Sequence, residues 1–333
     1  MHWPPRLQLA NLPTPLQRLD RFSRRFDGVD IWVKHDELTG LEVSGNKIRK
    51  LEFTIAQALE EGCDTLITCG GVQSNHCRAT AILGARLGLK VHLLLRGESP
   101  DVSDGNLLLD RLAGAEVTYV PVKEWSSHPQ LAEQLQEYYR AAGSRAFFIP
   151  VGASDAIGLW GYVAASQELQ RDLQQHNLDP DYIVVATGSG GTQAGLIAGR
   201  ALFGIDAEIK AFNVSDDAAY FQHKVSADLA LWRDRYQVDL DTAELPIHTV
   251  EGYLGPGYGQ ADADVFVTIA ELARLEGLFL DPVYTGKAFH GMVSELLKAE
   301  QGLNSALPAA RSVVFIHTGG LFGLFPQKQG FGF

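Results

Sequence analysis

The sequence contains little cysteine, and this scarcity limits the chemistry that the chain can use. Its three cysteines, Cys63, Cys69 and Cys77, form an odd set without the spacing of a disulfide framework. His76 next to Cys77 raises the question of a zinc site, but the chain has no C-x-x-C pair and no convincing fourth ligand. We therefore predict buried free thiols and no metal ion.

The chain also lacks a basic excess and any long apolar run. It has 28 basic and 40 acidic side chains and a formal net charge of -12, which argues against a nucleic-acid-binding surface. No apolar stretch approaches bilayer length, and residues 1–6 lack the apolar core of a signal peptide. We expect a cytoplasmic protein that binds a small molecule rather than nucleic acid or a membrane.

What the sequence does contain is a regular alternation of β-rich runs and helical patterns. Strands are predicted at residues 65–69, 91–95, 116–120, 146–151, 182–187, 208–214 and 312–317. Helices are predicted near residues 48–61, 75–88, 130–142, 157–175, 192–204, 261–276 and 287–300. Several strands are continuous apolar runs, which are typical of parallel sheets covered on both faces. The alternation predicts an α/β fold, and 333 residues exceed the usual size of one hydrophobic core.

The first candidate for chemistry is Lys47. It follows a glycine-containing turn, residues 44–46, and precedes an apolar repeat at three- and four-residue intervals over residues 48–59. The positive end of a helix and burial both favour a neutral amine, which can form a Schiff base with a carbonyl compound. The alternative is a solvated lysine in the first turn of a helix.

A second glycine-containing turn follows the predicted strand 182–187. It reads Gly188-Ser189-Gly190-Gly191-Thr192 and opens a predicted helix. Glycines let backbone N–H groups approach a ligand, and a helix N-terminus favours an anion. The turn is neither a P-loop nor a dinucleotide fingerprint, because no Gly-Lys-Ser/Thr follows and Gln193 stands at the third glycine position. It predicts a cradle for a single phosphate, with a ligand-free tight turn as the alternative.

Two further segments place polar side chains at the carboxyl ends of predicted strands, where α/β sheets bind ligands. Gln73, Ser74 and Asn75 stand at a predicted helix start, whose free backbone donors suit a carboxylate. Plain N-capping by Ser74 or Asn75 is the alternative. Near the C-terminus, Tyr284 can stack or hydrogen-bond in a pocket or serve ordinary packing, and Thr318 follows a buried strand.

Taken together, these segments resemble the fold-type II pyridoxal-phosphate enzymes (tryptophan synthase β-like), in the branch that holds 1-aminocyclopropane-1-carboxylate deaminase and D-cysteine desulfhydrase. The resemblance involves residues 12–16, 44–51, 70–77, 149–162, 187–195, 280–287 and 315–320. It implies two open, twisted, mostly parallel sheets flanked by helices. It also implies a larger domain of residues 1–51 and 158–333 that binds pyridoxal phosphate, a smaller domain of residues 52–157, and an active site between them. A small amino-acid substrate and a homodimer are further implications.

The same resemblance implies roles for individual residues. The catalytic residues are expected to be Lys47, Ser74 and Tyr284. Lys47 also holds the cofactor, together with Asn75, Gly188, Ser189, Gly190, Gly191, Thr192 and Thr318. The expected substrate contacts are Gln73, Ser74, Asn75, Tyr284 and Thr285.

Two positions favour the desulfhydrase branch. The deaminases look like Tyr-Glu-Gly-Lys at residues 284–287, so they have a glutamate where this chain has Thr285. They carry a leucine where this chain has Thr318. The desulfhydrases have small hydroxyl residues at both positions. A carboxylate beside the pyridine nitrogen keeps it protonated and makes the ring a strong electron sink, and a hydroxyl leaves the nitrogen closer to neutral. The sequence leaves open which threonine faces this nitrogen.

The resulting expectation is β-elimination of D-cysteine to pyruvate, ammonia and hydrogen sulfide by a carbon–sulfur lyase. The alternatives are deamination of 1-aminocyclopropane-1-carboxylate and elimination from another β-substituted alanine such as cysteate. From a different class, the chain could be a non-catalytic protein that binds pyridoxal phosphate or an amino acid, because a fold does not fix a function.

Overall fold

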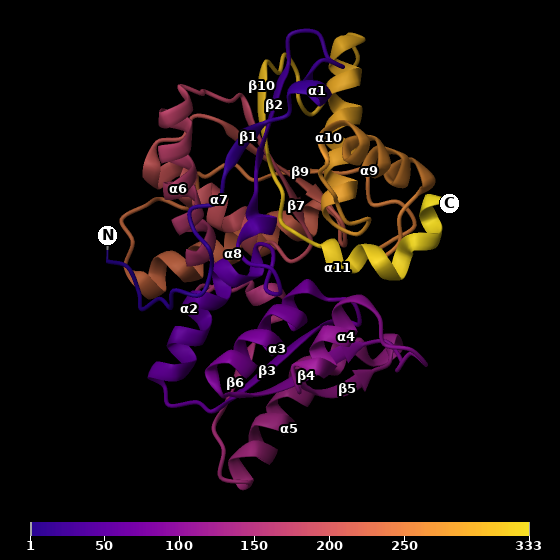
Figure 1. Cartoon of the computed structure of the whole chain (residues 1–333). Helices are drawn as coiled ribbons and strands as arrows, with labels where there is room; N and C mark the ends of the chain where they lie inside the picture. Colours follow the sequence, from indigo (N-terminus) through magenta and orange to yellow (C-terminus); the bar gives the residue numbers. More distant parts are fainter. Residues whose placement is uncertain (1, 333) are drawn as a thin grey trace.

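Two mostly parallel sheets organise the computed structural model, which describes residues 2–332 (Figure 1). The six-stranded sheet has the order β1 (Leu16–Arg18), β2 (Asp30–Lys34), β10 (Ser312–Ile316), β7 (Tyr182–Thr187), β8 (Glu208–Asn213) and β9 (His248–Val250). The four-stranded sheet has the order β5 (Glu116–Val120), β4 (Lys90–Arg96), β3 (Thr65–Gly71) and β6 (Ala146–Ile149). β1 pairs with β2 antiparallel, and the other pairs described are parallel.

Helices cover both faces of each sheet. They are α1 (Asp20–Ser23), α2 (Lys47–Glu60), α3 (Asn75–Leu87), α4 (Gly105–Leu112), α5 (His128–Ala141), α6 (Trp160–His176), α7 (Gly191–Phe203), α8 (Ala218–Tyr236), α9 (Ala263–Glu276), α10 (Thr285–Glu300) and α11 (Leu321–Leu324). Short 3₁₀ turns span Asp36–Leu38, Val122–Ser127, Val151–Ala153 and Phe325–Phe331. Across residues 2–332, none of the helices combines the length and apolar character needed to cross a bilayer.

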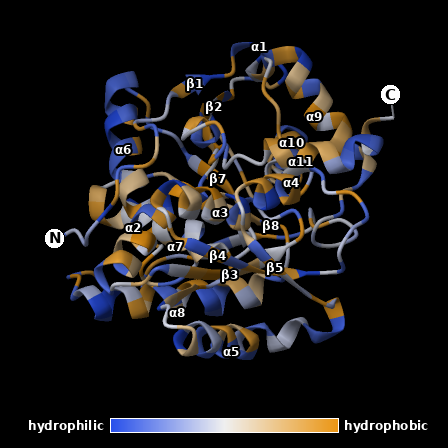
Figure 2. Ribbon diagram, turned by 60° about the horizontal axis from the view of Figure 1, so that its bottom comes forward, coloured by the Kyte–Doolittle hydropathy of each residue, from blue (hydrophilic) through white to orange (hydrophobic). Residues whose placement is uncertain are grey.

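The continuous apolar strands predicted from the sequence result from this two-sided cover. In the small sheet, Leu66 packs into a cluster with α2, α3 and α4, whereas its neighbour Ile67 packs into a second cluster with α5. In the large sheet, Ile183 packs with α6, α7 and α8, and Val184 packs with α9 and α10. Successive side chains of a strand point to opposite faces, so a strand covered on both sides is apolar throughout. Figure 2 shows hydrophobic residues along the interior strands and hydrophilic residues on the outer helix surfaces.

The seven predicted strands are confirmed, with ends within two residues of the prediction, and the seven predicted helices are confirmed within three. The strand predicted at 146–151 ends at Ile149 because Pro150 lacks the N–H that would continue the ladder. The sequence analysis missed the strands β1, β2 and β9 and the helices α1, α4, α8 and α11. Most of these are too short to show a period, but α8 buries Phe221, Val225 and Leu229 at four-residue spacing and was recognisable.

The strands of the small sheet all fall within residues 65–149, inside the predicted smaller domain of 52–157. Helix α2 crosses the predicted boundary, and it packs against both parts of the molecule. Its residues Leu51 and Ile55 belong to the small-sheet cluster, and Phe53 belongs to the cluster beneath α6 and α7. The domain limits therefore stay a prediction, and α2 is the element shared by the two cores.

A buried ion network fixes the first turn of α2. Arg49 is 1% exposed, and its guanidinium contacts Asp36 at 2.7 Å and both carboxylate oxygens of Glu168 at 3.0 Å. Lys34 extends the network with its Nζ at 2.6 Å from Glu168 and 2.5 Å from Asp172. Burial alone would raise the pKa of Glu168, but the Arg49 and Lys34 cations outweigh it and lower that pKa to about 2. The end of β2, the start of α2 and the middle of α6 are thus tied together by charge.

We predict that Arg49→Met destabilises the protein by about 3–5 kcal/mol, because it leaves the buried Asp36 carboxylate without its partner cation. Arg25→Met is the matched control, since Arg25 pairs with Glu271 at 2.6 Å with side chains 35% and 38% exposed; it should cost less than about 1 kcal/mol. Chemical denaturation of the two variants measures both values. Equal losses would show that the buried network contributes no more than a surface pair.

Candidate active site

The carboxyl ends of strands from both sheets meet around one cavity of about 500 Å³. From the large sheet it is lined by residues that follow β7, β8 and β10, and from the small sheet by residues at the ends of β3, β4 and β6. The residues predicted for the site that line it are Lys47, Ser74, Asn75, Gly188, Ser189, Gly190, Thr192, Tyr284 and Thr318. This is the location at which open α/β sheets bind ligands.

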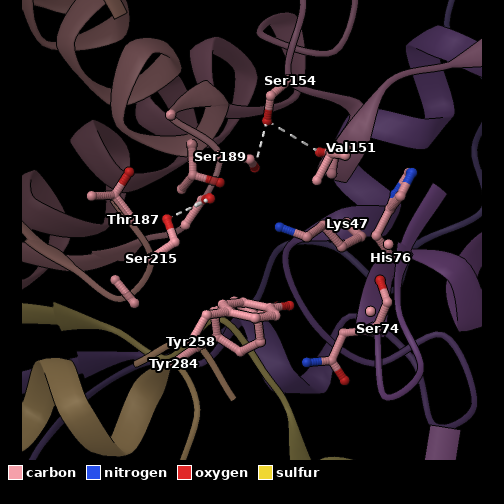
Figure 3. A pocket seen from close by; sticks show the side chains of 18 of the residues that line it. Lys47, Ser74, His76, Val151, Ser154, Thr187, Ser189, Ser215, Tyr258 and Tyr284 are labelled. Carbon is pink, nitrogen blue, oxygen red and sulfur yellow. Dashed lines mark hydrogen bonds between the residues drawn. The ribbon is translucent and has the colours of Figure 1, made fainter. Parts of the chain in front are cut away.

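Lys47 is the first residue of α2, as expected, and its amine points into the cavity (Figure 3). The preceding turn packs on the end of β10, where Asn46 donates its backbone N–H to the Thr318 carbonyl at 3.1 Å. A Cβ on Gly45, whose φ is +112°, would lie 2.6 Å from that same carbonyl, so only glycine fits there. Burial lowers the pKa of Lys47 to about 8, which brings its neutral, nucleophilic form into the physiological range.

The glycine turn before α7 forms a cradle with free backbone donors. Gly190 has φ +82° and stands at the N-terminus of α7, where the first N–H groups of the helix have no partners within the helix. Gly188, Ser189, Gly190 and Thr192 face the cavity. Gly191 lies behind them and donates its N–H to Ser154 Oγ at 3.2 Å. The geometry suits a single anion at a helix N-terminus.

Lys50 and Ser154 support this cradle, and neither was singled out from the sequence. Ser154 Oγ lies 2.8 Å from Ser189 Oγ (Figure 3), and the Lys50 amine donates to Ser154 Oγ at 3.3 Å and to the Gly152 carbonyl at 3.2 Å. Burial, reinforced by the charge of Lys47, holds the pKa of Lys50 well below its usual value. Lys50 lies three residues after Lys47 and so on the same helix face, which was a usable signal. Ser154 follows β6 within the segment 149–162 of the family resemblance, but no role was predicted for it.

The start of α3 supplies the polar wall opposite the cradle. Ser74 caps the helix by accepting the Cys77 N–H at 3.2 Å, so the capping interpretation is correct for it, and its hydroxyl hydrogen remains available to the cavity. Asn75 accepts from Asn106 at 3.1 Å through Oδ1, which turns its amide nitrogen into the free donor. These groups can bind a carboxylate or a ring oxygen.

Gln73 does not line the cavity, although it was predicted to contact substrate. Its amide nitrogen donates to the Asp104 carbonyl at 3.0 Å, and its amide oxygen accepts the Asn106 N–H at 2.9 Å. Both ends of the side chain are thus used to hold the start of α4. The geometry does not support a substrate contact for Gln73.

His76 also faces the cavity, at the second position of α3. The Thr68 hydroxyl donates to the Ile149 carbonyl at 2.8 Å, so the His76 Nε2–H must be the donor in its 2.7 Å contact with Thr68. Burial, with smaller effects of Lys47 and Lys50, holds the pKa of His76 well below its usual value. Its Nδ1 is buried and has no partner within residues 2–332, as is also true of Thr187 Oγ1. Two such acceptors around a cavity indicate that a polar group fills it.

Two tyrosines close a third side, with their hydroxyls in direct contact (Figure 3). Tyr284 precedes α10, and Asp281 fixes its backbone by accepting the N–H groups of Val283 at 2.9 Å and Tyr284 at 2.8 Å. Tyr258 was missed by the sequence analysis, although an aromatic residue among glycines 255, 257 and 259 was a signal. Burial keeps the pKa of Tyr284 well above its usual value, so this residue is a neutral phenol.

The two candidate threonines differ in position. Thr285 is fully buried, and its hydroxyl donates to Asp281 Oδ1 at 2.7 Å and accepts the Asp281 N–H at 2.9 Å. It does not line the cavity, so the predicted substrate contact of Thr285 lacks geometric support. Thr318 does line the cavity, and its hydroxyl has no protein partner in the described part of the chain. Of the two, only Thr318 lines the described cavity.

The prediction of buried free thiols is confirmed. Cys63, Cys69 and Cys77 are buried free thiols, and burial raises the pKa of Cys69 to about 12. Within residues 2–332 no group of three or more histidine, cysteine, aspartate or glutamate side chains is arranged to hold a metal ion.

Comparison with known proteins agrees with this geometry. Residues 7–319 match the family described as "Pyridoxal-phosphate dependent enzyme". The chain belongs to this family. A bifunctional D-cysteine desulfhydrase/1-aminocyclopropane-1-carboxylate deaminase of Arabidopsis thaliana is 40% identical over 330 residues, covering 96% of this chain and 79% of that protein. A D-cysteine desulfhydrase of Klebsiella pneumoniae (strain 342) is 39% identical, covering 96% and 95%.

A solved structure shows the same fold. The crystal structure of a protein described as an ACC deaminase homologue superposes with a TM-score of 0.88 at 34% identity, covering 99% of this chain and 96% of that one. The predicted fold-type II architecture and the predicted cofactor, pyridoxal phosphate, are confirmed. The cavity fits this cofactor, since it offers an amine at Lys47, a cradle for one phosphate before α7 and unpartnered polar atoms of His76 and Thr187 among its lining residues.

We predict that the apoprotein binds pyridoxal phosphate faster as pH rises through about 8 and that the rate then levels off. Lys47, with a pKa of about 8, is protonated and not nucleophilic below this pH and neutral above it. Stopped-flow measurement of the visible absorption band between pH 6.5 and 9.5 gives the profile. Lys47→Ala should remove the pH-dependent band, whereas Lys123→Ala, at a side chain 82% exposed, should leave it unchanged. A rate independent of pH would contradict the lowered pKa.

Proposed function

We propose that this enzyme catalyses β-elimination from D-cysteine, releasing pyruvate, ammonia and hydrogen sulfide. The single observation that carries the proposal is the hydroxyl of Thr318 at the cavity wall, with Thr285 turned away toward Asp281. Asp216 is the one carboxylate that lines the described cavity, and it is an exposed residue beside Ser215. A cofactor ring with no buried carboxylate beside it is a moderate electron sink, which suits a substrate with an α-proton and a good leaving group.

Pyridoxal phosphate, when bound, supplies an electron sink for the bonds at the substrate Cα. The protein then has four tasks. The cradle before α7 fixes the phosphate, and Ser74 and Asn75 hold the substrate carboxylate. The Lys47 amine accepts the α-proton. Tyr284, as a neutral phenol, donates a hydrogen bond toward the departing sulfur.

The bond changes balance with water as the one further reagent. The Cα–H proton passes to the Lys47 amine, and the Cβ–S bond breaks with its electron pair leaving on sulfur, which takes up a proton to become hydrogen sulfide. The 2-aminoacrylate that remains is hydrolysed by water to pyruvate and ammonia. Nothing in this sequence requires an oxidant or a metal ion.

A second candidate is deamination of 1-aminocyclopropane-1-carboxylate, which the name of the Arabidopsis relative includes. This substrate has no α-proton, and its ring opening demands stronger electron withdrawal. The cavity wall at Thr318 therefore favours elimination over ring opening. The homodimer implied by the family resemblance remains a prediction, as does the cytoplasmic location expected from the lack of a signal peptide and of a long apolar run.

We predict that D-cysteine yields 2-oxo acid at least about tenfold faster than L-cysteine or 1-aminocyclopropane-1-carboxylate. Coupled detection of 2-oxo acid and a separate sulfide assay measure it. Lys47→Ala should abolish release, and Lys123→Ala should not change it. Faster ring opening than desulfhydration would overturn the proposed substrate and leave the cofactor unaffected. A cofactor absorption band that amino acids perturb without any turnover would instead indicate a non-catalytic binding protein.

A second prediction concerns the two threonines. Thr318→Val removes the cavity hydroxyl at constant shape, and we expect kcat for D-cysteine to fall about tenfold because the ring nitrogen loses its partner. Thr285→Val is the matched comparison, since it removes the hydroxyl bonded to Asp281. It should lower the melting temperature, and it should lower kcat less than Thr318→Val does. The reverse pattern would place Thr285, not Thr318, at the ring.

A further inference from the structure

Arg96 is a cation on the cavity wall for which the proposed reaction has no task. It is the last residue of β4, and it is half-buried. Its guanidinium lies 4.9 Å from the ring centroid of Tyr258 and 5.8 Å from that of Trp125. Within residues 2–332 its side chain forms no hydrogen bond and no ion pair. Its charge is held in place by aromatic rings and is not neutralised by any carboxylate.

The rings around Arg96 restrict where its donors can point. Trp125 is stacked on His128, with centroids 4.5 Å apart and planes inclined by 12°, and His128 is fixed by the hydrogen bond of its Nδ1 to the Trp125 carbonyl at 2.8 Å. Tyr258 is fixed by its hydroxyl contact with Tyr284. The side chains that line the cavity here are Arg96, Trp125, His128, Tyr258 and Tyr284. A guanidinium stacked on aromatic faces keeps its edge of N–H donors free for a planar anion.

No other charged side chain that lines the described cavity pairs with Arg96. Lys224 is paired with Asp228, and Lys47 is the cofactor-binding amine. Asp216 lies beside Ser215, whose hydroxyl it contacts at 3.0 Å, and forms no ion pair with Arg96. Since the whole chain carries a net charge of -12, its general field repels a ligand with an additional negative charge. Arg96 provides a local site that opposes this repulsion.

We propose that Arg96 is a specificity-determining residue that recognises a second anionic group on the side chain of the amino-acid substrate. The inference rests on the proposed function, and it extends the substrate class from D-cysteine to β-substituted D-alanines whose leaving group is an oxyanion. The start of α3 binds the α-carboxylate through Ser74 and Asn75, which leaves the arginine for the substituent. Two other roles are possible outcomes of a test. Arg96 could bind the α-carboxylate itself, or it could be a staple between the β4 end and the Tyr258 loop.

The test compares isosteric acids and amides by binding alone. Holoenzyme is titrated with D-aspartate against D-asparagine and with D-glutamate against D-glutamine, following the visible absorption of the cofactor. The readout is the ratio of amide to acid dissociation constants, in which losses common to both ligands cancel. We expect a ratio of at least about ten for one pair, because a charge-assisted hydrogen bond to an oxyanion is much stronger than one to an amide.

Three variants locate the effect. Arg96→Gln should bring the ratio to about one, and Arg96→Lys should give an intermediate ratio because it keeps the charge and loses the planar, stacked fork. Lys123→Gln removes an exposed positive charge from the 3₁₀ turn that contains Trp125 and should leave the ratio as in the unchanged protein. A ratio near one in the unchanged protein overturns the proposal. So does a fall of acid and amide affinity by the same factor in Arg96→Gln, which would indicate the α-carboxylate or the staple role.

A kinetic arm separates this inference from the proposed function. O-phospho-D-serine and O-acetyl-D-serine both release pyruvate if the Cα–H proton passes to Lys47 and the Cβ–O bond breaks with its electron pair leaving on phosphate or acetate. We expect Arg96→Gln to lower kcat/KM for the phosphate ester at least about tenfold more than for the acetate ester. If neither ester nor D-cysteine yields pyruvate, the proposed function fails, and the binding ratios still decide the role of Arg96.

Discussion

The buried contact between Arg49 and Asp36 determines where the chemistry of this enzyme is located. Arg49 lies two residues after Lys47 on α2, and its guanidinium is held at 2.7 Å from a carboxylate that follows β2. The Tyr162 hydroxyl of α6 donates to the same carboxylate at 2.6 Å. A helix anchored at its first turn by charges can neither rotate nor slide without burying an unpaired ion. The orientation of the Lys47 amine is therefore set by an interaction outside the cavity.

Around that anchor, the fold brings polar groups from many strand ends to one cavity. A cofactor with a phosphate at one end and a reactive carbonyl at the other needs donors at several separate points. Parallel sheets direct their carboxyl ends to one edge, and two sheets facing each other double the number of such ends. The cradle after β7, Thr318 after β10, Ser74 after β3 and Arg96 at the end of β4 meet in this way. Asp281 and Lys287 position the two tyrosines of the cavity. Asp281 accepts the backbone N–H of Tyr284. Lys287 holds the Tyr258 loop by donating to the carbonyls of residues 254 and 257 at 2.7 and 2.8 Å.

Much of this was accessible from the sequence, and the limits have physical reasons. Lys47 and the cradle were found because helix starts and glycine turns are local features, visible in a few consecutive residues. The positions of Gln73 and Thr285 were not, since each is polar, lies within a motif and yet is used by a distant or buried partner. Ser154 and Arg96 reach the cavity only through tertiary packing. Short edge strands such as β1 and β9 have too few residues to show a period.

The position of β10 has a consequence for how the molecule is made. This strand, Ser312–Ile316, lies between β2 and β7 in the large sheet, and the turn before Lys47 packs on the residues that follow it. The strands β1 and β2, which precede the other described strands in the chain, therefore meet the rest of their sheet only after β10 has left the ribosome. A nascent chain can complete the small sheet early, because all its strands are contiguous in sequence. The cofactor pocket, in contrast, is complete only after Thr318 and Gly319, which follow β10, have been translated.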